Sequence, residues 1–256
     1  MKIWHMNGAG NDFMVMDARG MELDFVPLAV KLCAISGADG FMAVDTAEDA
    51  DFRLHFYNSD GSRGEMCGNG ARCICRFAYE NGIARETMTI HTDAGIVSGQ
   101  RISAQDYRIG MTIPTGLDLQ RKPGIAYVEV GCPHAVREYG GNLRADADSL
   151  KETMRDLRFD PVFPKGANVD FYTWQGENTA QILTFERGVE DFTLACGTGS
   201  CALATVLWAQ GKLPGGVLKV ENPGGTLTVT VEGTKGCITK LLLEGPTEIT
   251  QIYDME

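Results

Sequence analysis

The sequence has no excess of basic residues and no long apolar run. Its 256 residues include 23 Lys and Arg against 34 Asp and Glu, which gives a formal net charge of -11. Such a surface repels polyanions, so nucleic acid and anionic membranes are poor candidates as partners. The apolar stretch at 25–30 is interrupted by Lys31, well short of the roughly 20 residues needed to cross a bilayer.

Signals for export, metal binding and dinucleotide binding are also missing. The opening MKIWHMNGAGNDF lacks the basic start, apolar run and cleavage site of an export signal, so the expected location is the cytoplasm. Eight cysteines are present, but none lies in the Cys-x2-Cys repeats or beside the histidines of a zinc site. The segment Gly8-Ala9-Gly10 lacks the third spaced glycine of a dinucleotide fingerprint.

Strand-like and helix-like runs alternate along the chain. With 44% hydrophobic and 22% charged residues, the composition is that of a globular protein, and the length favours two modest domains. The patterns predict helices over 27–35, 71–80 and 201–210, and strands over 13–16, 41–44, 53–57 and 181–185. The predicted fold class is therefore mixed α/β (α+β).

Two glycine-rich segments, EMCGNGARC and ACGTGSC, indicate an internal duplication. Cys67 and Cys196 are 129 positions apart, and Gly95 and Gly225, each in a hairpin turn, are 130 apart. Because the two offsets agree, a repeated unit of strand, loop, helix and hairpin is expected. We predict half-domains over 1–114 and 115–244, divided near Pro114, and a segment 245–256 that returns to the first.

Each segment places a thiol at the expected start of a helix. The partial positive charge there favours a thiolate, and the free backbone N–H groups can hold a carboxylate. If two such loops held the α-carboxylate of an amino acid, one thiolate could remove the α-proton while the other thiol returned a proton to the opposite face. This pattern favours two-base racemisation or epimerisation by Cys67 and Cys196 without a cofactor.

The remaining cysteines have other interpretations. Cys33, Cys75 and Cys237 are interpreted as structural residues, since single cysteines usually act as small hydrophobes. Cys132 and His134 could belong to a cysteine hydrolase, but the duplicated thiol argues against that class.

These residues closely resemble those of the diaminopimelate epimerase family. Beside the two cysteine segments, the resemblance rests on motifs that follow the family's order from Gly8 to Cys201: Gly8 to Phe13, Phe56 to Gly61, Pro133-His134, Asn168 to Phe171 and Glu186 to Val189.

The resemblance implies an isomerase of lysine and peptidoglycan precursor biosynthesis. It implies two pseudo-symmetric domains, each a mixed sheet wrapped around a central helix, a cleft between them, a homodimer, and neither pyridoxal phosphate nor a metal. Cys67 and Cys196 would be the catalytic acid/base pair, and His134 a proton relay. The substrate-binding residues it implies are Asn11, Asn58, Gly68, Asn69, Asn168, Glu186, Arg187, Gly197 and Thr198.

Two departures from the family pattern concern specificity. Cys132 stands where the family has asparagine before Pro-His, and Phe192 replaces an acidic residue expected near the cleft. A racemase of another amino acid, such as histidine, is therefore an alternative. Alternatives of other classes are a non-catalytic amino-acid-binding protein and a dehydratase or isomerase, although such enzymes often replace one of the two thiols.

Overall fold

The computed structural model describes residues 2–64, 67–234 and 236–254. Contacts divide the chain into two compact units, Met1–Gly110 with Glu244–Glu256, and Met111–Leu243. In these described ranges, no helix combines the length and the apolar character that a membrane span requires.

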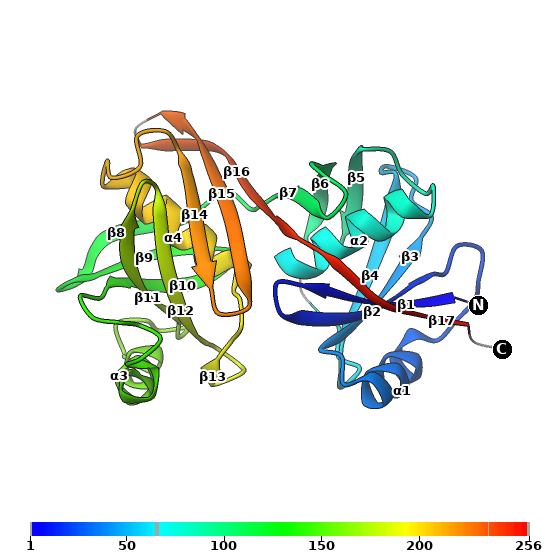
Figure 1. Cartoon of the computed structure of the whole chain (residues 1–256), viewed down its shortest axis with the longest axis horizontal. Helices are drawn as coiled ribbons and strands as arrows, with labels where there is room; N and C mark the ends of the chain where they lie inside the picture. The colour runs from blue at the N-terminus through cyan, green and yellow to red at the C-terminus, as the bar shows by residue number, and fades with distance from the viewer. Residues whose placement is uncertain (1, 65–66, 235, 255–256) are drawn as a thin grey trace. The chain divides into compact units, whose positions relative to one another are not determined.

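The first unit is a mixed sheet curved around one helix (Figure 1). Its strands pair in the order β17, β1, β2, β3, β4, β5, β6 and β7, with β2/β3 and β4/β5 parallel and the other pairs antiparallel. The elements are β1 (Lys2–Gly8), β2 (Asn11–Asp17), α1 (Phe25–Ser36), β3 (Gly40–Asp45), β4 (Phe52–Asn58), α2 (Gly68–Glu80), β5 (Thr87–Thr92), β6 (Gly95–Arg101), β7 (Asp106–Gly110) and β17 (Glu248–Asp254).

The second unit repeats this plan. Its strands pair in the order β8, β9, β10, β11, β12, β14 and β15, with β10/β11 and β12/β14 parallel and the others antiparallel. The elements are β8 (Thr115–Lys122), β9 (Ile125–Val130), β10 (Cys132–Glu138), α3 (Ala147–Arg158), β11 (Asn168–Gly176), β12 (Thr179–Glu186), β13 (Asp191–Phe192), α4 (Gly197–Ala209), β14 (Val217–Asn222), β15 (Gly225–Thr234) and β16 (Cys237–Pro246).

Seven strands and two helices of each unit therefore correspond to one another. In this correspondence β17 and β1 to β6 take the places of β8 to β12, β14 and β15, and α1 and α2 take those of α3 and α4. The strand β16 crosses the division between the units at Leu243 and Glu244. The predicted mixed α/β class and pseudo-symmetry are confirmed.

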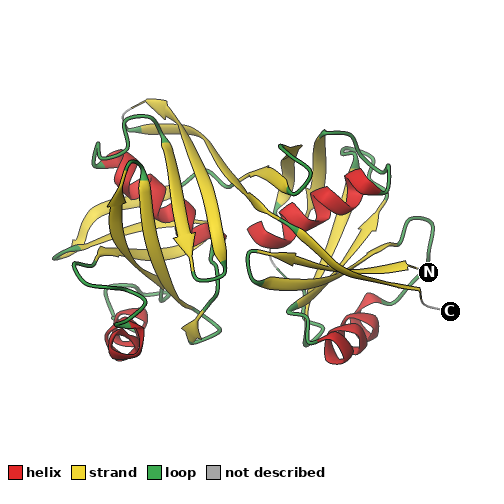
Figure 2. Ribbon diagram, in the orientation of Figure 1, coloured by secondary structure: helices red, strands yellow, loops and turns green. Residues whose placement is uncertain are grey.

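The helices α2 and α4 form the centres of their units. The helix α2 contacts β1, β2, β3, β6 and β7, and α4 contacts β9, β10, β11, β14 and β15. Figure 2 shows each of these helices lying along the strands of its own unit. Nearly every residue of α4 before Trp208 is buried, which explains why it is apolar on all sides.

A second helix packs on the outer face of each sheet, so the strands between the two helices are covered on both faces. In the first unit, Met14 and Met16 of β2 share a core cluster with Leu32 of α1. In the second, Val169 and Phe171 of β11 pack with α3. Because strand side chains alternate between faces, the residues between these positions point toward the central helices.

Candidate active site

Cys67 is the N-cap of α2. Its backbone is extended, with φ -100° and ψ 120°, and its carbonyl accepts the Ala71 N–H at 2.8 Å. The predicted helix start at Ala71 was wrong, because α2 begins at Gly68 and the glycines form its first turn. A Cβ at Gly70 would lie 3.2 Å from the Met42 sulfur, so glycine at this position allows close packing of the helix on the sheet.

Polar side chains support the start of α2. Asn69 Nδ2 donates to Asn11 Oδ1 at 2.6 Å, and Arg72 Nη2 donates to Asn69 Oδ1 at 2.9 Å. The fully buried Arg72 also donates through Nη1 to the Gly68 carbonyl at 3.2 Å. The Arg72 guanidinium thus fixes both the Asn69 side chain and the carbonyl of the residue next to Cys67. No role was predicted for Arg72 from the sequence, because Arg76 and Glu80 lie in the same helix and a charged residue there is not distinctive.

The predicted residue Asn58 pairs with Gly40 in the β3/β4 ladder. It is exposed at the end of β4, and its Nδ2 donates to Ser62 Oγ at 2.9 Å within a turn. The amide nitrogen of Asn11 is also hydrogen-bonded, because Asn11 Nδ2 donates to Asp39 Oδ2 at 3.2 Å. The first unit therefore brings Asn11, Gly68 and Asn69 together, and Asp39 links Asn11 to the turn after Asn58, because the Asp39 carbonyl accepts the Ser59 N–H at 3.1 Å.

Cys196 has the corresponding place as the N-cap of α4. Its Sγ accepts the Gly199 N–H at 3.3 Å and lies 3.3 Å from Thr198 Oγ1. Cys196 is 4% exposed, and this burial raises its pKa well above the ordinary value, an effect that the charges of Glu186 and Asp170 increase. Cys196 is accordingly a protonated thiol at neutral pH.

The backbone at this helix start is fixed by a ring of hydrogen bonds. The Cys196 N–H donates to Asn222 Oδ1 at 3.3 Å, Asn222 Nδ2 donates to Ser200 Oγ at 3.2 Å, and Ser200 Oγ donates to the Cys196 carbonyl at 2.9 Å. The helix begins at Gly197, earlier than the predicted start at Cys201. The thiol is thus held on a rigid turn, although none of these supporting residues was identified from sequence.

A buried ion pair lies beside the Cys196 loop. His134 Nδ1 is 2.7 Å from Asp170 Oδ2, and neither side chain is exposed. Thr184 Oγ1 donates to Asp170 Oδ1 at 2.7 Å. Burial alone would lower the pKa of His134, but the charge and hydrogen bond of Asp170, with a contribution from Cys132, outweigh it and raise the pKa to about 10. His134 is an imidazolium at neutral pH.

The sulfur of Cys132 completes this cluster. It lies 3.3 Å from His134 Nε2 and 3.6 Å from Thr198 Oγ1, and it accepts from Asn168 Nδ2 at 3.5 Å. Burial raises the pKa of Cys132, but the hydrogen bond and charge of His134 outweigh burial and lower it below the ordinary value. Cys132 and His134 stand two residues apart on β10, so their side chains point to the same face of the sheet.

The strand register explains why these polar groups meet. His134 pairs with Asn168 in the parallel β10/β11 ladder, and Asp170, two residues on, pairs with Thr184 in the antiparallel β11/β12 ladder. His134, Asp170 and Thr184 therefore point toward the first turn of α4. In the first unit the corresponding inward positions, reached through the same pairings, are held by Phe13, Met42 and Phe56. Beneath the two helix starts, the first unit thus has an apolar floor formed by Phe13, Met42 and Phe56. The second unit has a polar floor formed by His134, Asp170 and Thr184.

Two equivalent glycines provide a test of this difference. Gly199 and Gly70 each stand three residues after their cysteine. A Cβ at Gly199 would lie 2.5 Å from Asp170 Oδ1, whereas at Gly70 the nearest atom is the flexible Met42 sulfur at 3.2 Å. We expect G199A to lower the free energy of unfolding by about 1–3 kcal/mol, because Asp170 must move away from His134 or the helix must shift.

The matched variant G70A should change the free energy of unfolding by less than about 1 kcal/mol, since better helix propensity offsets a small displacement of Met42. Urea unfolding followed by circular dichroism measures both. Equal destabilisation of the two variants would contradict the assignment of a rigid polar floor to the second unit alone.

The remaining predicted residues of the second unit lie near the ends of β11 and β12. Asn168 Oδ1 accepts the Arg187 N–H at 2.8 Å, and Arg187 Nη1 donates to the Lys165 carbonyl at 3.1 Å. Burial raises the pKa of Glu186. Asn168 also contacts the Cys132 sulfur, so it connects Arg187 with the cluster beside Cys196.

Phe192 occupies a different environment from the one its sequence position suggested. It pairs with Phe185 across β12 and β13, the two rings meet edge to face at 5.9 Å, and Phe192 packs against the core cluster on the α3 side of the sheet. Its aromatic character therefore serves packing of the second unit.

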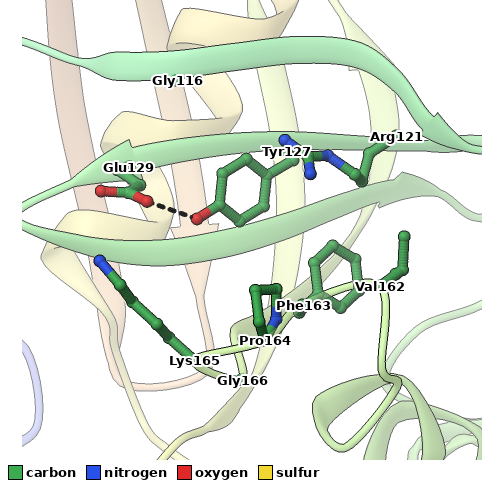
Figure 3. Close-up of a pocket in the computed structure, with 9 residues that line it drawn as sticks. All are labelled: Gly116, Arg121, Tyr127, Glu129, Val162, Phe163, Pro164, Lys165 and Gly166. Atoms are coloured by element: carbon green, nitrogen blue, oxygen red, sulfur yellow. Dashed lines mark hydrogen bonds between the residues drawn. The ribbon is translucent and has the colours of Figure 1, made fainter.

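A separate pocket of about 230 Å³ lies on the second unit (Figure 3). In the described part of the chain, none of the predicted site residues lines it. Tyr127 Oη donates to Glu129 Oε1 at 2.6 Å inside the pocket, and Arg121 lies over the Tyr127 ring. These polar groups satisfy one another, and the pocket adds nothing to the cysteine sites.

Comparison with known proteins agrees with this geometry. The family described as Diaminopimelate epimerase matches residues 3–112 and 126–245. Diaminopimelate epimerase of Aquifex aeolicus is 36% identical, with 90% of this chain and 89% of that protein covered. Diaminopimelate epimerase of Chlorobaculum tepidum is also 36% identical, with 94% and 96% covered.

Solved structures show the same fold at lower identity. A Bacillus anthracis phenazine biosynthesis protein of the PhzF family has a TM-score of 0.76 at 16% identity, with 100% of this chain and 99% of that chain covered. A probable proline racemase from Agrobacterium radiobacter K84 has a TM-score of 0.70 at 18% identity, with 100% and 92% covered. From the family match and these identities, the chain belongs to the diaminopimelate epimerase family.

Proposed function

We propose that this isomerase interconverts LL- and meso-diaminopimelate by a two-base reaction, in which one of Cys67 and Cys196 removes the α-proton and the other donates a proton to the opposite face. The observation that carries the proposal is the position of each cysteine as N-cap of a central helix in a duplicated unit. Curated relatives that are diaminopimelate epimerases over most of this chain support the choice of substrate.

The first turns of α2 and α4 would hold the reacting carboxylate. Free N–H groups at a helix start bind anions and would stabilise the negative charge that develops when the α-proton leaves. In the proposal, Gly68 and Asn69 of one unit and Gly197 and Thr198 of the other bind the α-carboxylate and α-amino group.

The protonation state of Cys196 sets the roles of the two thiols at rest. Cys196 is protonated because of its burial and the nearby carboxylates, so it is the proton donor, and Cys67 acts as the base toward the isomer whose α-hydrogen faces it. After one inversion the proton has moved from Cys196 to the product and from the substrate to Cys67, and the roles are exchanged for the reverse reaction. His134 would serve as the proton relay on the Cys196 side.

The other end of the substrate would be held by the remaining predicted residues. The Arg187 guanidinium offers a fork of donors that suits a distal carboxylate, and Glu186 offers an acceptor for a distal ammonium group. Asn11, Asn58 and Asn168 would complete this part of the site.

The test is α-hydrogen exchange in heavy water with a panel of amino acids. Diaminopimelate should exchange with inversion, while lysine, which lacks the distal carboxylate, should exchange at least about tenfold more slowly. Exchange on histidine with none on diaminopimelate would favour the alternative racemase, which Cys132 at a family asparagine position motivates. Binding of diaminopimelate without exchange would instead indicate a non-catalytic binding protein.

We also propose a cytoplasmic homodimer. The resemblance to the family supports this assembly, and precursor biosynthesis supports the location. Light scattering after size exclusion should give twice the 27.8 kDa mass of the chain. A single-chain mass at micromolar concentration would contradict the dimer.

A further inference from the structure

Position 132 has an internal reference in the first unit. By the register of the two ladders, Cys132 on β10 corresponds to Asn11 on β2. Asn11 contacts Asn69, the second residue of α2, and Cys132 makes the corresponding contact with Thr198, the second residue of α4. At position 132 a thiol therefore stands where the first unit has the amide of Asn11, and it makes the same contact with the second residue of the helix.

The surroundings of Cys132 have the arrangement of an activated nucleophile. Its sulfur is 3.3 Å from the Nε2 atom of His134, whose Nδ1 is 2.7 Å from Asp170, so the thiol, the imidazole and an orienting carboxylate follow one another. The other titratable groups facing this cluster are Glu186 from β12 and Cys196 from α4. His134 is the cation among them, and its Nε2 is directed at the sulfur.

Exposure distinguishes Cys132 from the buried cysteines of the chain. Cys132 is partly exposed, whereas Cys33, Cys73 and Cys75 are buried, and burial raises their pKa values to about 11, 12 and 12. Thiolates react with soft electrophiles and thiols do not, and Cys132 combines partial exposure with a sulfur 3.3 Å from the His134 Nε2 atom.

We propose that Cys132 is a modification site for small alkylating electrophiles, held as a thiolate by His134 and Asp170. With iodoacetamide, the sulfur electron pair forms the S–C bond while the C–I bond breaks and iodide leaves. The imidazolium keeps its proton throughout. The inference does not depend on which amino acid the enzyme accepts.

Alkylation of the native protein across pH tests the proposal. The protein is treated with limiting iodoacetamide at pH 6, 7 and 8, and the Cys132 peptide is quantified by mass spectrometry. The native rate should change less than about threefold over this range, whereas the same peptide in urea-unfolded protein should react about tenfold faster for each pH unit, as an ordinary thiol does. A native rate that also rises tenfold per unit, or no labelling of Cys132, would overturn the proposal.

The variant H134Q isolates the cation. Glutamine can still donate to Asp170, and the native labelling rate of Cys132 should regain its tenfold rise per pH unit. Retention of the flat profile in folded H134Q would show that His134 does not hold the thiolate and would overturn the proposal. If H134Q does not fold, the wild-type pH profile decides by itself.

Discussion

Replacement of Cys67 or Cys196 with alanine is expected to lower the rate of α-carbon inversion by about 10²- to 10⁴-fold, the usual contribution of a positioned acid or base. Each thiol handles the proton on one face of the substrate, so neither can substitute for the other. The rate is measured as the approach of one pure diaminopimelate stereoisomer to equilibrium.

The exposed Cys237 on β16 provides the control. C237A removes a thiol from the same chain and should leave the inversion rate within about twofold of wild type. Circular dichroism should show that C67A and C196A are folded. Inversion within tenfold of wild type in either folded variant would remove the two-base mechanism.

The variant D170N is expected to reduce the free energy of unfolding by about 3–5 kcal/mol near pH 7, because it leaves the fully buried imidazolium of His134 without its counter-charge. The matched control is D191N, which removes a carboxylate paired with Lys151 where both side chains are about half exposed. That exposed pair should contribute less than about 1 kcal/mol. Urea unfolding of the two variants and wild type gives the comparison, and similar losses would contradict the assignment of a buried ion pair.

The stability from this pair has a defined dependence on pH. The pKa of His134 is raised from the ordinary 6.5 to about 10 on folding, so its contribution is fully present below about pH 6.5 and is lost as the pH rises through about 10. The lowered pKa of Cys132 acts in the opposite sense, because its contribution is present at high pH and lost as the pH falls. We therefore expect the difference in unfolding free energy between wild type and D170N to shrink from pH 7 to 10. When the C132N substitution is added to both wild type and D170N, this difference in unfolding free energy should decline more steeply with pH.

Much of the fold could be predicted from the sequence because it repeats itself. The offsets between the cysteine segments and between the hairpins agree to one residue and indicated the duplication, and the predicted helix at 27–35 is confirmed as α1. The starts of α2 and α4 were misplaced because glycine is read as a turn former. Here Gly70 and Gly199 are helical and are needed for close packing on the sheet.

The polar floor beside Cys196 was harder to predict, because it depends on register between strands distant in sequence. Nothing in the sequence near Asp170 shows that it faces Thr184 and lies against His134. Motif spacing placed Cys196 at a helix start, but its protonation state follows from burial and from carboxylates on other strands. The link of Cys132 to this cluster likewise depends on the fold.

The position of β17 in the sequence affects the order in which the two units can fold during synthesis. The strand β17, which pairs with β1, lies at Glu248–Asp254. The corresponding strand of the second unit, β8, comes immediately before its partner β9 in the chain. A ribosome therefore releases every residue of the second unit before it releases the last strand of the first. The half of the protein that is translated first is the half whose sheet is completed last.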